Sequence, residues 1–171
     1  MSKGKKRGVY PSYYRQNVIR NAERRYLREK KTKAAVLTEK RQRVVDMLSK
    51  YIQLSLVQQF KATQEQINRT GAEVDALSRW YQGILDMQGK ERAKELLKEK
   101  TSGFLPDSFW MPSNITLNED ELAAAREAGD LTARIWCAAI NKVFGYDKRR
   151  LVKVLRGARE IYRKDIDTTD K

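Results

Sequence analysis

Arginine, lysine and tyrosine are interleaved over the first 43 residues, and these side chains can act together on a polyanion. The guanidinium group of arginine binds phosphate through two parallel N–H groups, and a tyrosine ring stacks on unpaired bases. We predict that this segment binds the backbone of DNA or RNA without reading much of its sequence. The residues assigned to this contact are Lys5, Lys6, Arg7, Tyr13, Tyr14, Arg15, Arg20, Arg24, Arg25 and Arg28.

Other interpretations of this basic segment stay open. It is compatible with a solvated segment that has no ligand, or with one that binds an acidic groove on another protein. An anionic membrane surface is a poorer match, because residues 13–33 form only a thin apolar face when arranged as a helix. We therefore expect no membrane partner.

The region around Gly145 resembles the helix-turn-helix pattern of bacterial and phage DNA-binding proteins. In that pattern a glycine permits a tight turn, and apolar residues on both sides lock two helices together. Asn141 departs from the pattern, which usually has alanine or glycine there for close helix contact. The apolar residues that match it are Ile140, Phe144, Tyr146, Leu151 and Val154.

This resemblance implies that the second helix of the pair presents its cations to the major groove of a duplex. At about 100° per residue, four cations lie opposite the apolar face of that helix: Arg149, Lys153, Arg156 and Arg163. The alternative is an ordinary helical hairpin whose basic face is only solvated. The residues assigned to the contact are Arg149, Arg150, Lys153, Arg156 and Arg163.

Charge is unevenly distributed along the 171 residues, whose formal net charge is +14. Residues 1–43 hold 15 Lys and Arg against 3 acids, and residues 142–164 hold 9 against 2. The segment between them, residues 44–141, holds 11 against 14. Solubility does not require this segregation, whereas an anionic partner explains it.

The residue inventory argues against catalysis. The chain has no histidine, the commonest acid–base group and metal ligand at neutral pH, and no glycine-rich phosphate loop or zinc-type spacing. We expect the single cysteine, Cys137, to be a packed small side chain, because no histidine is present to activate it. We predict a non-catalytic cytoplasmic protein without a metal or cofactor. The spacing of the acidic residues leaves one enzymatic alternative open, a nuclease whose metal ion is bound by carboxylates.

The elements that position these residues are all predicted to be helices. We expect an all-α helical bundle with a long N-terminal helix or arm and a C-terminal helix-turn-helix-like pair. Its expected parts are a basic arm or helix over 1–43, a helical core over 44–164 and an acidic disordered tail over 165–171. Ser12 to Thr70 contains no Gly or Pro and predicts one helix, or two with a break at Thr32 or Thr38.

Glycines and capping residues mark the other expected boundaries. Gly71, Gly89 and Gly129 are each expected to end or bend a helix. Asn118 and Asp147 are expected to begin one, and the last helix is predicted to end near residue 164. Residues 104–117 contain two prolines and several aromatic residues, which predicts an irregular segment packed over the core, or an exposed binding surface for a protein.

The stretch FGYDKRRLVKVLRGAREIY, residues 144–162, is similar to the C-terminal part of short helical proteins of phages and prophages of Gram-positive bacteria. This similarity implies a role associated with a phage or mobile element. We expect a nucleic-acid-binding accessory or regulatory protein. The alternative is a protein inhibitor or adaptor, for example of the anti-CRISPR type, that binds a larger nucleic-acid-processing complex. A homodimer is compatible with the long helices.

Overall fold

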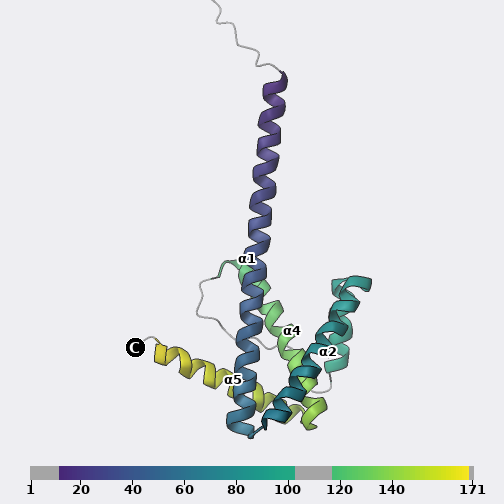
Figure 1. Ribbon diagram of the computed structural model, residues 1–171, viewed down its shortest axis with the longest axis vertical. Coiled ribbons are helices and arrows are strands. Elements are labelled where there is room, and N and C mark those ends of the chain that lie inside the picture. Colours follow the sequence, from purple (N-terminus) through teal and green to yellow (C-terminus); the bar gives the residue numbers. More distant parts are fainter. Residues whose placement is uncertain (1–11, 103–116, 170–171) are drawn as a thin grey trace, which may run out of the picture. The chain divides into compact units, whose positions relative to one another are not determined.

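The computed structural model describes residues 12–102 and 117–169, and every element in these ranges is an α-helix (Figure 1). Side chains are described for residues 22–30, 32–102 and 117–166. The prediction of an all-α protein is confirmed. The helices are α1 (Ser12–Phe60), α2 (Gln64–Gln88), α3 (Lys90–Thr101), α4 (Glu119–Phe144) and α5 (Lys148–Thr169).

The chain divides into two units, Met1–Glu39 and Lys40–Lys171, and α1 contributes residues to both. In the first unit, the described side chains are exposed except Val36 and Leu37, which are half-buried. A helix with so few buried residues has little tertiary packing to stabilise it. In the second unit, buried residues of all five helices form two hydrophobic clusters.

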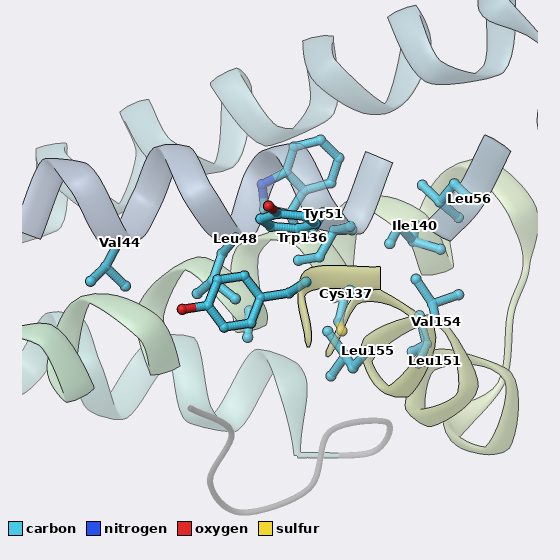
Figure 2. Packing of buried hydrophobic residues seen from close by; sticks show 14 of the residues in the cluster. Val44, Leu48, Tyr51, Leu56, Trp136, Cys137, Ile140, Leu151, Val154 and Leu155 are labelled. Carbon is cyan, nitrogen blue, oxygen red and sulfur yellow. The ribbon is translucent and has the colours of Figure 1, made fainter. Parts of the chain in front are cut away.

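The larger cluster joins the second half of α1 to α4 and α5, as Figure 2 shows. On α1, Leu48, Ile52 and Leu56 recur every four residues and are completely buried. This spacing places them on one face of the helix, as the sequence predicts. The residues that complete the centre of the cluster from the other two helices are Trp136, Cys137, Ile140, Leu151, Val154 and Leu155.

α4 is the central helix of the second unit, because it contributes to both clusters. Residues 132–140 are all buried, so this part of α4 is covered on every side. The smaller cluster packs α2 and α3 against α4 through Tyr81, Ile84, Ala93, Leu97 and Ile135.

The expected breaks in the first helix are wrong. α1 is continuous through Thr32 and Thr38, whose hydroxyl groups donate to the carbonyl oxygens four residues earlier, each at 2.9 Å. The helix ends at Phe60 instead, where Lys61 adopts a left-handed backbone conformation with φ of 56°. Thr63 then begins α2 through a capping box with Gln66. The Thr-x-x-Gln spacing of this capping box is visible in the sequence and indicates the boundary, which the positions of the glycines do not.

Two of the helix ends predicted at glycines are also wrong. Gly71 lies inside α2, and Gly129 lies inside α4, where it is buried. Asp130, the residue after Gly129, accepts a hydrogen bond of 2.9 Å from Arg134 Nε within the same helix. A glycine inside a helix costs about 1 kcal/mol, which the packing of α2 and α4 can offset. Gly89, in contrast, ends α2 with φ of 84°, as predicted.

The predicted capping residues are confirmed. Asn118 forms a capping box with Glu121 at the start of α4, where the Glu121 N–H donates to Asn118 Oδ1 over 2.9 Å. Asp147 accepts the N–H of Arg150 over 2.9 Å at the start of α5. α5 continues to Thr169, beyond the expected end near residue 164, so residues 165–169 are helical. Of the predicted aromatic segment, residues 104–116 lie outside the described residues.

Candidate nucleic-acid interface

The turn between α4 and α5 sets the start of α5, the helix that carries the C-terminal cations. Gly145 ends α4 in the left-handed conformation with φ of 66°, and its N–H donates to Asn141 O over 2.8 Å. The side-chain amide of Asn141 donates to Tyr146 O over 2.8 Å. Asn141, the residue that departs from the helix-turn-helix pattern, therefore stabilises this turn by a hydrogen bond across it.

The apolar residues around this turn pack as the pattern requires. Ile140, Leu151 and Val154 are completely buried in the larger cluster. The rings of Phe144 and Tyr146 are half-buried, and their centroids lie 5.0 Å apart. These contacts fix the start of α5 against the end of α4.

α1 holds α5 along its other side. Gly157 permits a close approach, because a Cβ built at this position would lie 2.6 Å from Ser55 Oγ. The Ser55 hydroxyl donates to Val154 O over 2.9 Å, in a buried position. Further along α5, the rings of Tyr51 and Tyr162 pack edge to face with centroids 5.2 Å apart. The orientation of α5 about its own axis is therefore determined by contacts with α1 and α4.

This orientation leaves the predicted cations of α5 at the surface. Each of the five assigned residues is exposed. At 3.6 residues per turn, the four that the sequence places on one face lie within about 80° of each other around the helix. They are Arg149, Lys153, Arg156 and Arg163, and we call them the α5 stripe.

Arg150 is separate from this stripe. Its guanidinium carbon lies 5.3 Å from the centroid of the Tyr146 ring, in a cation–π contact beside the turn. Between residues 149 and 163, the acidic residue that falls within the sector of the stripe is Glu160, which is exposed. The stripe therefore carries a local excess of positive charge over roughly 21 Å of helix, from residue 149 to residue 163.

The predicted N-terminal contacts are described only in part. Lys5, Lys6 and Arg7 lie outside the described residues, and the backbone of residues 13–20 is helical. The side chains of Tyr13, Tyr14, Arg15 and Arg20 also lie outside the described set.

The remaining N-terminal residues, Arg24, Arg25 and Arg28, are exposed on α1 and lie within about 100° of each other around the helix. The neighbouring Tyr26 and Leu27 are exposed as well, at 63% and 56% of their surface. This unit therefore presents a basic helix surface, and the exposed Tyr26 lies about 100° or more around the helix from each of the three arginines.

Several other cations of the second unit are paired with carboxylates. Glu127 of α4 receives three of them: Lys90 Nζ at 2.8 Å, Lys94 Nζ at 2.5 Å and a nitrogen of Arg41 at 3.5 Å. The Lys90 and Lys94 hydrogen bonds outweigh burial and lower the pKa of Glu127. Other ion pairs of this unit are Arg92–Glu95, Arg134–Asp130 and Lys142–Glu73.

The α5 stripe and the three arginines of α1 have no such partners. Among the residues whose side chains are described, none of these seven cations makes an ion pair with a carboxylate. The contrast with the ion pairs of Glu127 and its neighbours means that the positive charge of these seven residues is available to a ligand.

The other sequence expectations about chemistry can be compared with the same structure. Cys137 is completely buried, as predicted, and burial raises the pKa of its thiol to about 12. Over the described ranges, His, Cys, Asp and Glu side chains form no group of three or more that could hold a metal ion. Within these ranges there is also no helix with both the length and the apolar character of a membrane span.

Comparison with known proteins adds no relative to this description. No family model, no curated protein and no solved structure matches the chain.

Proposed function

We propose that this protein is a non-catalytic nucleic-acid-binding accessory protein that contacts backbone phosphates. The observation that supports this most strongly is the α5 stripe, which has no carboxylate partner among the described side chains and lies on a helix whose orientation is fixed by the core. A rigid row of cations can face a polyanion without first breaking its own ion pairs, so binding retains the full electrostatic gain.

The dimensions of the stripe suit a nucleic-acid backbone. Its length of roughly 21 Å spans about six phosphates of one B-form strand, which are about 3.4 Å apart along the axis. Each cation that reaches a phosphate releases a condensed counterion, so affinity decreases steeply as salt rises. Such contacts position the protein on the nucleic acid and carry little sequence information.

The first part of α1 supplies a second surface of the same chemistry. Arg24, Arg25 and Arg28 can bind phosphates, and the exposed ring of Tyr26 can stack on an unpaired base. Because Tyr26 lies on another face of the helix from the arginines, a ligand that uses both must be a flexible strand, whereas the α5 stripe suits a duplex or a single strand.

The test is fluorescence anisotropy of the full chain with labelled duplex DNA, single-stranded DNA and RNA at 50 to 200 mM salt. The variant replaces Arg149, Lys153 and Arg156 by glutamine. We expect its affinity for the best of the three probes to fall by about tenfold or more, and the slope of log affinity against log salt to decrease by about 2 to 3.

A matched control removes the same charge elsewhere. Arg69, Arg79 and Lys98 are exposed cations of α2 and α3, and their replacement by glutamine also lowers the net charge by three. We expect less than a threefold change in affinity for this control, because its cations lie outside the proposed surface. An equal effect of both triple variants, or absence of binding to all three probes, would overturn the proposal.

A further inference from the structure

A cavity of about 590 Å³ lies between α1, α2 and α4 and has no part in the proposed interface. Its volume is in the range of small-molecule sites. Residues of α1, α2, α3 and α4 line it, and no residue of α5 does. The middle of its wall is apolar and includes Val45, Leu85, Leu131 and Ile135.

The two ends of this cavity differ. At one end, Trp136 Nε1 donates to Ser49 Oγ over 2.9 Å, so the indole N–H is already satisfied. At the other end are Arg41 and Lys90, which both contact Glu127. Arg41 and Ser49 are eight residues apart on α1, which corresponds to roughly 12 Å along the cavity.

Positive charge is in excess at the polar end. Arg41, Lys90 and Lys94 all contact Glu127, and Lys94 also lies 3.8 Å from Glu91, so three cations face two carboxylates. Arg41 makes the longest of the contacts to Glu127, at 3.5 Å. A guanidinium group has five N–H donors in a planar fork, so Arg41 retains donors for a second carboxylate.

The wall of the cavity also contains a polar group that can bond to a ligand, the hydroxyl of Tyr81. Tyr81 lines the cavity, and only 8% of its surface is exposed. Within the described part of the chain, its hydroxyl makes no hydrogen bond, although Lys94 and Glu127 act on it electrostatically. Buried polar groups are normally satisfied, so a hydroxyl in this position can bond to a ligand.

We propose that this cavity binds a small amphipathic monocarboxylate, with an apolar body of up to about 12 Å between the three helices. Arg41 binds the carboxylate, the Tyr81 hydroxyl donates to it, and the apolar wall buries the body. The proposal is independent of nucleic-acid binding, because it uses none of the cations assigned to that function.

The probe is decanoate, titrated calorimetrically into the full chain, with decanol and acetate as comparisons. Decanol keeps the apolar body without the charge, and acetate keeps the charge without the body. We expect decanoate to bind with one site per chain, decanol to bind at least about tenfold more weakly, and acetate to give no measurable binding.

Two substitutions on the same helix locate the carboxylate. Arg41→Gln is expected to weaken decanoate by about tenfold and to leave decanol unchanged. Arg43→Gln is the matched control, because Arg43 is exposed and does not line the cavity. Leu131→Trp, which fills the cavity, is expected to abolish binding of both ligands, with circular dichroism reporting whether the variant is folded.

If Leu131→Trp does not fold, the comparison of Arg41→Gln with Arg43→Gln decides the question alone. Equal affinities for decanoate and decanol, equal effects of the two arginine substitutions, or no binding at all would overturn the proposal. It is also overturned if sedimentation shows a dimer that must dissociate before decanoate binds, because a second copy of the chain would then occupy the cavity.

Discussion

Tyr51 and Tyr81 are both buried residues, but only the hydroxyl group of Tyr51 has a hydrogen-bond partner in the described structure. It donates to Asp165 Oδ2 over 3.0 Å and thereby joins α1 to the C-terminal part of α5. Tyr51→Phe removes this bond and is expected to lower the free energy of unfolding by about 1 kcal/mol, since the carboxylate is half exposed to solvent.

Tyr81→Phe is the matched comparison. Removal of a buried hydroxyl without a partner is expected to leave the free energy of unfolding unchanged or to raise it slightly. Urea unfolding of the two variants beside the wild type measures both effects. A loss of stability in Tyr81→Phe as large as that in Tyr51→Phe would show that the Tyr81 hydroxyl is bonded within the protein.

Burial also makes the fold sensitive to alkaline pH. It is the largest cause of a rise in the pKa of Tyr51 from 10.0 to about 12 and in that of the Cys137 thiol from 9.0 to about 12. Between the unfolded and the folded pKa, the unfolded chain has lost a proton that the folded chain keeps. Stability is therefore fully present below about pH 9 and decreases from there towards pH 12.

We expect the urea midpoint to fall between pH 7.5 and pH 10.5, and the fall to be smaller in Cys137→Ala. At about 1.4 kcal/mol per pKa unit, the thiol accounts for about 2 kcal/mol of that decrease. If Cys137→Ala loses as much stability over this range as the wild type, the thiol does not contribute to the pH dependence.

At the scale of helices, the contact between α1 and α5 depends on one small residue. A Cβ at Gly157 would lie 2.1 Å from Gln59 Oε1 and 2.6 Å from Ser55 Oγ. The exposed Gln59 can move, but Ser55 is buried and bonded to Val154 O. Gly157→Ala is therefore expected to destabilise the protein by about 1 to 3 kcal/mol.

Gly83→Ala in α2 is expected to have the opposite effect on the stability of the protein. A Cβ there would have nothing within 4 Å, and the position is inside a regular helix. The substitution is expected to stabilise the protein by about 0.5 to 1 kcal/mol, because alanine loses less backbone entropy than glycine on folding. Thermal unfolding of both variants measures the difference. A stabilised Gly157→Ala would contradict the close approach of α1 and α5.

At the scale of the whole molecule, we expect the core to fold without residues 1–33. The buried residues of both clusters begin at Val44, so deletion of residues 1–33 removes none of them. The shortened chain is expected to unfold with a midpoint close to that of the full chain. Its affinity for nucleic acid is expected to decrease and to depend less on salt, because phosphate contacts are lost.

Far-ultraviolet circular dichroism and the anisotropy titration measure these two properties on the same preparation. If the shortened chain binds as tightly as the full chain, the N-terminal segment is not a nucleic-acid contact and only the α5 stripe remains as one. If the shortened chain is unfolded, α1 is required as an intact helix for the core to form.

The sequence by itself determined the features that depend on neighbouring residues. The capping box at Asn118, the cap at Asp147, the left-handed turn at Gly145 and the amphipathic face of α5 were all predictable, because each depends on residues a few positions apart. The continuity of α2 and α4 through Gly71 and Gly129 was not, since tertiary packing offsets the local cost of a helical glycine.

Only the tertiary structure decided which cations form ion pairs with carboxylates. Glu127 forms ion pairs with cations of α1 and α3. Its hydrogen-bond partners Arg41 and Lys90 are 86 and 37 residues away in the sequence. The same packing formed the cavity between α1, α2 and α4 and left the α5 stripe without carboxylate partners in the described part of the chain. Such pairings require distant residues to meet in space, and sequence spacing along one helix does not specify that.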